Sequence, residues 1–433
     1  MISPNFDSIS DSIDSASTLA GSRFDLFEHL AEDFGTPFYL YDADELADRA
    51  AELSGLLPAG ANSQVLFSFK SNPNPLVSEQ LREAGCRADL TSPGELVAAK
   101  KAGFDLSEAL YGGPGKSEEE LVGAISAGVR SFSVESPEDL SCLARAARSE
   151  AVRVRGLIRI NPSEAPKAKL AMSGVASQFG FEEADLRVRG NQLLDGADEW
   201  VDLVGVHIYW GTQIGEVEAL LACFEKAIEI AEDLSEQHGF PLEVLNLGGG
   251  FPWPYSKEGR APDLSDLKEG LENLHENAGR ASDAEWWFES GRFLCASSGT
   301  LVTRVMDRKV SKDEKEFLIL DTGIHHLGGM AGLGRIPRFS IDLIVPPERA
   351  GNEEIEVDVV GQLCTPLDCI GRRLSLPSVE PGDLVAVPNV GAYGVTASVV
   401  GFLSRPTPVE ILHRGGKVLG TNRLRSGHES FEG

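Results

Sequence analysis

The sequence predicts an α/β fold, a (β/α)8 TIM-like barrel followed by a C-terminal all-β domain. The chain has 433 residues, enough for two domains. Strand-like and helix-like runs alternate through its first two thirds, a pattern typical of a parallel sheet. Eight such units over about 245 residues match the size of a closed barrel. A doubly wound open sheet is the alternative, but no dinucleotide-binding glycine pattern opens a β–α unit.

The barrel elements follow one another at regular intervals. Strand-like runs are short and apolar, and helix-like runs place apolar residues at helical spacing. Ser117 followed by three glutamates predicts a capped helix start. The predicted strands are 64–69, 86–90, 107–111, 130–134, 153–160, 202–208, 242–247 and 284–289. The predicted helices are 44–56, 74–84, 93–103, 117–127, 136–149, 183–194, 214–238 and 265–278.

The flanking segments differ from the barrel in composition. Residues 1–35 begin with a polar, acidic stretch that predicts a disordered leader. The barrel is expected over 36–297, and strand-like residues 36–42 can pair with the second domain instead. Residues 298–433 alternate apolar and polar positions between Gly/Pro turns, which predicts a β-sandwich or barrel-like domain. Its strand-like runs are 301–305, 317–320, 339–344, 355–360 and 384–387.

Composition excludes several classes of function. The net charge of −28 argues against nucleic acid and anionic membranes as partners. No apolar run reaches membrane-spanning length. The six cysteines lack paired or finger-like spacing, so we expect a reduced, cytoplasmic protein without a metal site.

Chemically distinctive residues gather at the predicted strand ends. The carboxyl ends of parallel barrel strands meet at one mouth, so these side chains are expected to lie together. They are Lys70 after the first strand, Asp89 on the second, Tyr209 and Thr212 after the sixth, Gly248, Gly249 and Gly250 after the seventh, and Glu289 and Arg292 at the eighth.

Each of these residues also has an ordinary structural interpretation. The glycines suit a tight turn, Glu289 and Arg292 an ion pair, and Asp89 a helix cap. Taken together, these residues favour a catalytic site over separate structural roles. A desolvated lysine forms a Schiff base with an aldehyde, and glycine N–H groups with an arginine hold a phosphate. A carboxylate keeps a pyridine nitrogen protonated, so the ring accepts electrons from a carbanion. The sequence therefore predicts a pyridoxal 5′-phosphate site and a reaction such as decarboxylation.

From about residue 36 to 413 the chain resembles the fold-type III pyridoxal-phosphate decarboxylases, the family of ornithine and diaminopimelate decarboxylases. The matching motifs are Phe69–Asn72, Gly248–Phe251, Glu289–Arg292, Gly361–Asp368 and Gly391–Gly394. The resemblance implies a head-to-tail homodimer with its active sites at the subunit interface.

The resemblance also implies residue roles. Lys70 would bind the cofactor covalently, with Asp89 nearby, and Glu289 would contact the pyridine nitrogen. Cys364 would enter from the second subunit and protonate the product, although buried cysteines are more often inert packing. The phosphate would be held by Gly248, Gly249, Gly250, Arg292 and Tyr393, with Thr212 a weaker candidate.

Two positions depart from the family pattern. Tyr209 stands where relatives have a histidine on the cofactor face, and Thr365 stands where they have an acidic residue after the cysteine. In the family that carboxylate helps to bind the distal ammonium of the substrate. Its loss would cost about 2–5 kcal/mol, by analogy with other truncated charge pairs. Asp368 is the residue that could replace it.

The motifs Tyr111–Ser117, Asp321–Leu327 and Cys364–Asp368 resemble a subgroup that decarboxylates aminoacyl groups held on an acyl carrier protein in secondary-metabolite pathways. A neutral thioester tail suits Thr365 better than an ammonium does. A carrier-linked, plausibly acidic amino acid is therefore the first hypothesis. A free amino acid such as diaminopimelate, lysine or ornithine is the second, and a cofactor-less regulatory homologue is the third.

Basic and histidine residues in the β domain raise two further questions. Arg335 and Arg338, with Arg372 and Arg373, are candidates for a substrate carboxylate or carrier phosphate, or else ordinary solvated surface. The pair His325–His326 could suggest a metal. Adjacent strand residues point to opposite faces, however, so we interpret both histidines as structural.

Overall fold

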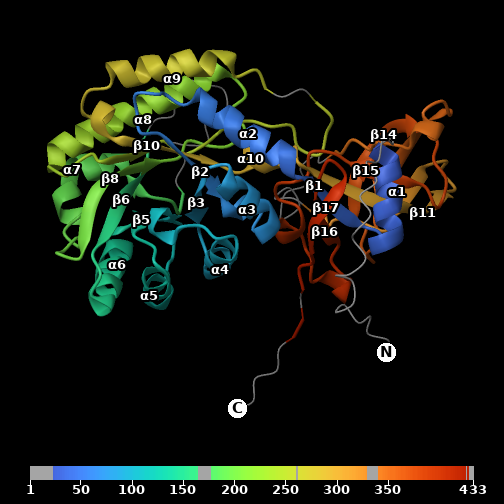
Figure 1. Ribbon diagram of the computed structural model, residues 1–433, viewed down its shortest axis with the longest axis horizontal. Helices are drawn as coiled ribbons and strands as arrows, with labels where there is room; N and C mark the ends of the chain where they lie inside the picture. The colour runs from blue at the N-terminus through green and yellow to red at the C-terminus, as the bar shows by residue number, and fades with distance from the viewer. Residues whose placement is uncertain (1–22, 164–176, 260–261, 329–339, 426, 429–433) are drawn as a thin grey trace.

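The computed structural model describes residues 23–163, 177–259, 262–328, 340–425 and 427–428. It contains a closed barrel of eight parallel strands and a second sheet of eight strands, side by side in Figure 1. The predicted fold class is confirmed. No helix in the described part of the chain is long and apolar enough to cross a membrane.

The barrel strands are joined in the order β5-β4-β3-β2-β10-β9-β8-β6, and β6 pairs with β5 to close the ring. Every strand pair in the ring is parallel. The carboxyl ends of the strands therefore share one mouth. The strands are β2 (Gln64–Ser68), β3 (Arg87–Leu90), β4 (Leu110–Tyr111), β5 (Ser131–Val134), β6 (Val154–Asn161), β8 (Val201–Ile208), β9 (Val244–Asn246) and β10 (Glu285–Ser290), with β7 (Phe181–Glu182) beside β6.

Helices surround the barrel, and those from α2 to α6 begin at a side chain that caps the first turn. Ser117 accepts a hydrogen bond from the Glu120 amide, which confirms the predicted start of α5. Asn74 caps α3 in the same way through the Leu76 amide. The helices are α2 (Ala43–Leu56), α3 (Pro75–Glu83), α4 (Pro93–Lys101), α5 (Glu118–Ala127), α6 (Pro137–Glu150), α7 (Glu183–Leu193), α8 (Val217–His238), α9 (Ser265–Asn277) and α10 (Arg292–Cys295).

The second sheet combines strands from both ends of the chain, in the order β14-β13-β12-β11-β1-β16-β17, with β15 also paired to β11. Strand β1 (Phe38–Asp42) lies antiparallel to β11 (Gly299–Val310) and parallel to β16 (Val409–Arg414). The strand-like residues before the barrel therefore belong to this sheet. Its remaining strands are β12 (Glu316–Leu320), β13 (Glu354–Val360), β14 (Cys369–Pro377), β15 (Leu384–Val387) and β17 (Lys417–Asn422).

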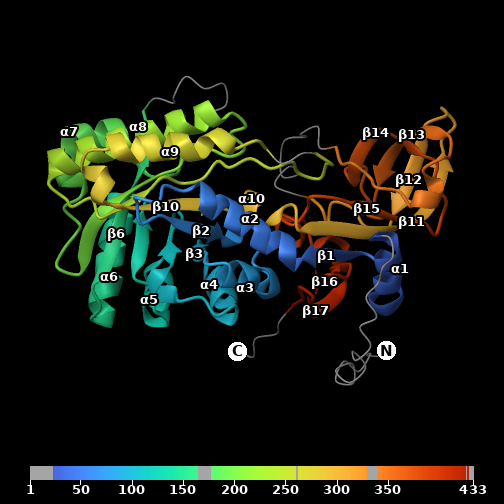
Figure 2. The same cartoon turned by 45° about the horizontal axis from the view of Figure 1, so that its top comes forward.

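The predicted leader is wrong over its last third, because α1 (Arg23–Phe34) is a helix. Its Phe24, Phe27 and Leu30 recur at helical spacing and pack against the second sheet in one apolar cluster. Figures 1 and 2 show this helix beside the C-terminal strands, far from the barrel helices α5 to α7. Residues 1–22 lie outside the described residues.

The strand expected over 339–344 is also wrong. Residue 339 lies outside the described residues, and the segment 340–344 makes one isolated bridge, between Ile344 and Ala386. The Asp342 amide instead donates to the Ser256 carbonyl at 2.8 Å, and the Asp342 side chain accepts from the Glu258 amide. Contacts to a barrel loop therefore replace pairing to a sheet.

The two units meet at the loop that follows β2. The Tyr393 amide donates to the Ser71 carbonyl at 2.6 Å, and Asn72 Nδ2 donates to the Gly391 carbonyl at 2.8 Å. These contacts fix one end of the barrel mouth against the β domain. They also hold the turn that carries Lys70.

Candidate active site

Lys70 lies at the barrel mouth beside a buried carboxylate. It occupies a short 3-10 turn, η2 (Phe69–Ser71), directly after β2. Its Nζ lies 3.7 Å from Asp89 Oδ2, because Asp89 is the β3 partner of Ser68. The Lys70 side chain is 44% exposed, whereas that of Asp89 is 4% exposed. The amine is thus open to incoming molecules while its counter-charge is enclosed.

On sequence grounds Lys70 is a desolvated amine, whose pKa would be lowered, whereas the structure gives it a raised pKa. Burial among protein atoms lowers its pKa, but the charges of Asp89 and Glu289 outweigh that effect and leave the pKa raised. The pKa of Asp89 is also raised, by burial first and by the Glu289 charge second. The desolvation argument was incomplete because it left out two carboxylates supplied by neighbouring strands.

Glu289, on β10, has one oxygen close to two side-chain nitrogens. Its Oε1 accepts from Asn246 Nδ2 at 2.9 Å and lies 3.1 Å from His207 Nε2. Burial opposes ionisation, but His207, Lys70 and Asn246 together lower the pKa of Glu289 far below its usual range. Sequence reasoning missed His207 and Asn246 as site residues. The available signal was a polar residue near the end of an otherwise apolar strand.

The glycine turn after β9 approaches its neighbours too closely for any side chain. A Cβ on Gly249 would lie 2.4 Å from the Glu289 carbonyl oxygen. Gly248 and Gly250 have φ angles of +68° and +113°, which glycine adopts readily. No hydrogen bond within the described residues takes up the amides of Gly249 and Gly250. The turn therefore presents two backbone donors without a protein partner.

Arg292 follows β10 and stands between two tyrosine rings. Its guanidinium carbon lies 4.9 Å from the ring centroids of both Tyr255 and Tyr393. Its buried Nε has no hydrogen-bond partner in the described part of the chain. Among the described residues no ion pair joins Arg292 to Glu289, whose Oε1 instead lies 3.1 Å from His207 Nε2. The arrangement leaves the Arg292 charge free to meet an anion, and sequence reasoning missed Tyr255.

Tyr209 and Thr212 follow β8 on the Lys70 side of the mouth. The Tyr209 ring centroid lies 5.8 Å from Lys70 Nζ. The Thr212 side chain is exposed and hydrogen-bonds to Tyr209. Burial raises the pKa of Tyr209, so its hydroxyl is neutral at physiological pH.

The structure places the predicted site residues of the β domain in different surroundings. Cys364 is exposed in the loop 361–368. Asp368 is 3% exposed, with Oδ1 accepting from the Ile324 amide and Oδ2 from the Leu363 amide, both at 2.8 Å. These two hydrogen bonds hold Asp368 against its own loop, and its role in substrate binding stays a prediction. Arg335 and Arg338 lie outside the described residues.

The two histidines of the β domain lie in a turn, not on a strand as expected. The His326 amide donates to the Gly323 carbonyl, and the rings of His325 and His326 are 3.7 Å apart. Burial lowers the pKa of His325 to about 3 and that of His326 to about 4. In the described part of the chain no cluster of metal-ligating side chains forms here or elsewhere.

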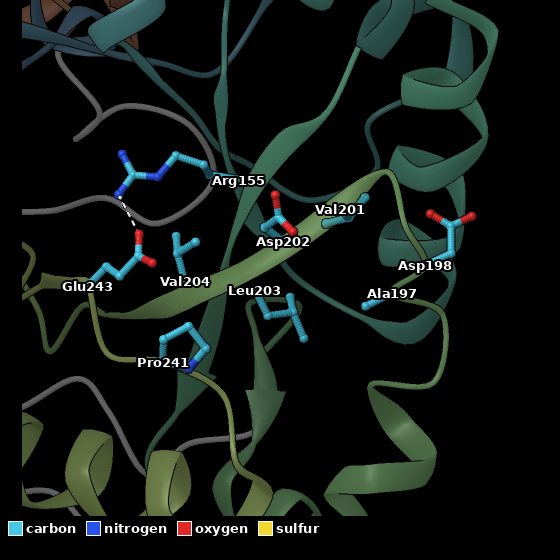
Figure 3. Close-up of a pocket in the computed structure, with 9 residues that line it drawn as sticks. All are labelled: Arg155, Ala197, Asp198, Val201, Asp202, Leu203, Val204, Pro241 and Glu243. Carbon is cyan, nitrogen blue, oxygen red and sulfur yellow. Dashed lines mark ion pairs between the residues drawn. The ribbon is translucent and has the colours of Figure 1, made fainter. Parts of the chain in front are cut away.

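A pocket of about 550 Å³ lies at the amino-terminal ends of the barrel strands, whereas Lys70 follows the carboxyl end of β2. Figure 3 shows the residues that line it. It is lined by the starts of β6 and β8, including Arg155, Asp198 and Asp202. Arg155 pairs with Glu243 across it at 3.6 Å. The strand starts of such barrels serve stability, whereas the carboxyl ends carry chemistry. The mouth around Lys70 is therefore the candidate active site.

Comparison with known proteins identifies the family of the chain. The model of the pyridoxal-binding domain of pyridoxal-dependent decarboxylases matches residues 44–296. The L-glutamyl-[BtrI acyl-carrier protein] decarboxylase of Niallia circulans is 35% identical over 89% of this chain and 91% of its own length. The diaminopimelate decarboxylase of Aquifex aeolicus is 31% identical over 90% of both chains. The crystal structure of diaminopimelate decarboxylase from Helicobacter pylori complexed with L-lysine has a TM-score of 0.77, at 28% identity, over 89% of this chain and 94% of that chain.

The chain belongs to the pyridoxal-dependent decarboxylases. It is a pyridoxal-phosphate-dependent amino acid decarboxylase, a carboxy-lyase, as the resemblance implied. The cofactor-less alternative is thereby set aside.

Proposed function

We propose that the protein decarboxylates an α-amino acid, in the first place a glutamyl group, carried by an acyl carrier protein. One observation carries the proposal. The loop 361–368 has Thr365 after its cysteine, and both oxygens of its one carboxylate, Asp368, are already occupied by backbone amides.

The occupied Asp368 weakens the case for a free diamino acid. Binding a distal ammonium in an enclosed site requires a counter-charge, and an ammonium left without one costs several kcal/mol. A thioester tail is neutral and needs no such partner. The relative from Niallia circulans, whose name states a glutamyl group on a carrier protein, supports the same substrate class.

The residues at the mouth fit the cofactor. A phosphate would accept the unpaired amides of Gly249 and Gly250 and face the Arg292 charge, with Tyr393 beside it. Glu289 Oε2, which has no partner in the described part of the chain, would face the pyridine nitrogen. Lys70 would bind the aldehyde, and Tyr209 would lie against the ring.

When bound, pyridoxal phosphate supplies an aldehyde for the substrate amine and a ring that accepts the electron pair released as CO2 leaves. Lys70 would hold the cofactor aldehyde between turnovers. Glu289 would keep a proton on the ring nitrogen. Asp89 would hold the Lys70 ammonium, and Cys364 Sγ would supply a proton to the product.

We propose that Cys364 acts in the site of a second subunit, so the working unit is a homodimer. Its exposure in the loop 361–368 makes it available to another chain. An exposed thiol on a loop suits proton delivery better than one packed in a core.

The test is a CO2-release assay on the holoenzyme. The substrates are glutamyl-carrier protein, aspartyl-carrier protein, glutamyl-pantetheine, free glutamate, diaminopimelate, ornithine and lysine. We expect turnover of the carrier-linked and pantetheine-linked groups and little turnover of the free amino acids. Faster turnover of a free diamino acid would contradict the proposal.

A variant of Thr365 gives a second test of the substrate class. Thr365→Asp restores a carboxylate at the position where relatives have an acid, and Thr365→Ser is the matched control. We expect the Asp variant alone to raise kcat/KM for diaminopimelate, by about tenfold or more for one charge-assisted hydrogen bond. A diaminopimelate activity already present in the unaltered protein would favour the second candidate, which the similarity to the Aquifex aeolicus enzyme supports.

A further inference from the structure

A buried row of polar side chains runs from β5 through β8 to β10. Ser133 Oγ lies 2.8 Å from His207 Nδ1, and His207 Nε2 lies 3.1 Å from Glu289 Oε1. Ser133, His207 and Glu289 are 0%, 4% and 4% exposed. Burying polar groups is costly unless they interact with one another or with a ligand. Three of them in close approach at the barrel mouth therefore call for a functional explanation.

We propose that His207 is a positioning residue for decarboxylation, which keeps Glu289 ionised and turned toward the cofactor nitrogen, with Ser133 selecting the tautomer of His207. The proposal rests on the cofactor site described above. It does not depend on whether the substrate is carrier-linked.

The hydrogen-bonding capacity of the three side chains gives one consistent assignment. An ionised carboxylate accepts only, so the 3.1 Å approach of His207 Nε2 to Glu289 is favourable when Nε2 carries a proton. In a neutral imidazole the other nitrogen then accepts, and the Ser133 hydroxyl is the donor that reaches it. The Ser133 hydroxyl is within hydrogen-bond distance of Nδ1, and Nε2 lies 3.1 Å from Glu289 Oε1 without the alignment of a full hydrogen bond. Without the Ser133 hydroxyl, nothing on β5 would favour the tautomer with its proton on Nε2. A proton on Nδ1 instead would leave His207 with no N–H for Glu289.

The second donor to Glu289 explains the direction of its side chain. Asn246 Nδ2 also donates to Oε1, and Asn246 is itself fixed because its Oδ1 accepts from the Gly248 amide at 2.9 Å. Asn246 Nδ2 and His207 Nε2 both lie at Oε1, which leaves Oε2 for a donor that comes from outside the protein. A protonated pyridine nitrogen is a donor of that kind.

His207 also offsets the other charge in the site. The groups that face Glu289 are His207 from β8, Asp89 from β3 and Lys70 from the turn after β2. Asp89 is a carboxylate, and its negative charge opposes ionisation of Glu289. The N–H of His207 favours ionisation, so Glu289 remains an acceptor that can hold a proton on the ring nitrogen.

The experiment compares cofactor binding by variants of His207. His207→Leu removes the donor, whereas His207→Gln keeps an N–H near the same place. Each apoprotein is titrated with pyridoxal phosphate and with its analogue in which carbon replaces the ring nitrogen, and Kd is read from tryptophan fluorescence and cofactor absorbance. Ser133→Ala tests whether the Ser133 hydroxyl selects the tautomer of His207. Ser131→Ala on the same strand is its control.

We expect His207→Leu to bind pyridoxal phosphate about 10- to 100-fold more weakly, the range for losing a hydrogen bond to a charged group. His207→Gln should recover most of that loss, and Ser133→Ala should weaken binding less. With the carbon analogue, all variants should bind as the unaltered protein does, because no ring N–H remains to be held.

Two results would overturn the proposal. Equal weakening toward both cofactors would make His207 a structural residue, and undiminished binding of pyridoxal phosphate by His207→Leu would remove it from the site. Should His207→Leu fail to fold, as judged by circular dichroism of the apoprotein, Ser133→Ala decides. Its affinity must fall for pyridoxal phosphate and not for the analogue.

Discussion

At the scale of single residues, the site depends on opposite charges held within a few ångströms. Lys70 Nζ lies 3.7 Å from Asp89, and the pKa of Lys70 is raised although burial alone would lower it. The sequence was sufficient to predict Lys70, Asp89 and Glu289 at one mouth, because strand ends in a parallel barrel converge. It was insufficient for their protonation, which depends on distances between strands far apart in the chain.

Asp89→Asn should lower the pKa of Lys70, because the substitution removes the charge that most favours the protonated amine. Capture of pyridoxal phosphate requires an unprotonated amine, so the pH at which capture is half-maximal should move to lower values. The measurement is the rate of cofactor capture by apoprotein from pH 6 to pH 10. Exposed Glu79 supplies the control variant Glu79→Gln, and equal profiles for all three proteins would refute the assignment.

At the scale of elements, the alternation of strands and helices was predictable because each element has its own periodicity and its own caps. Ser117 before three glutamates marked the start of α5 correctly. The structure of segment 340–344 was not predictable. Its alternating apolar residues are typical of a strand, but Asp342 hydrogen-bonds to a barrel loop instead of a neighbouring strand. His207 and Asn246 were missed for a related reason. Only the fold shows that both reach the same oxygen of Glu289.

Gly249→Ala should abolish cofactor binding. The added methyl group would lie 2.4 Å from the Glu289 carbonyl oxygen, so the turn after β9 must move. Gly123→Ala is the control, since nothing lies within 4 Å of a methyl group there, and alanine in helix α5 should stabilise the fold by roughly 0.5–1 kcal/mol. Cofactor titration and thermal unfolding measure both effects. Normal cofactor affinity in Gly249→Ala would show that the turn is not the cradle.

The histidine turn of the β domain should make the protein acid-sensitive. His325 has a folded pKa of about 3, lowered by burial and by His326, whereas an unfolded histidine titrates near 6.5. Its unfolded form binds the proton more readily, so stability is complete above pH 6.5 and is lost as pH falls toward 3. Between pH 7.5 and pH 5 this one group costs roughly 2 kcal/mol.

Urea unfolding at pH 7.5 and pH 5 tests this acid sensitivity with His325→Leu. The variant should lose less stability between the two pH values than the unaltered protein, by about the amount assigned to His325. His29→Leu on the exposed face of α1 is the control and should change nothing. An equal loss in all three proteins would place the acid sensitivity elsewhere.

At the scale of the whole molecule, the second sheet joins the two ends of the chain. Strand β1 lies between β11 and β16, and α1 covers that sheet with Phe24, Phe27 and Leu30. No local sequence pattern predicts the position of β1 in this sheet, since its partner strands lie more than two hundred residues away along the chain. The contact of Tyr393 with Ser71 then brings the β domain to the turn of Lys70.

A shared active site can be tested by mixing two inactive variants. Lys70→Ala lacks the cofactor lysine, and Cys364→Ala lacks the proton donor. In a head-to-tail homodimer, each mixed dimer has one site with both residues native, so random exchange should restore about a quarter of the normal activity. Co-expressed variants provide the measurement, and the separate variants provide the baseline. Absence of recovery would place Cys364 in the site of its own chain or outside the mechanism.

The central claim is that the mouth around Lys70 holds pyridoxal phosphate. The most direct measurement is borohydride reduction of the holoenzyme followed by peptide mass mapping. The account predicts one modified peptide, which carries the reduced cofactor on Lys70 and disappears in Lys70→Ala. Modification of another lysine, or of none, would contradict it.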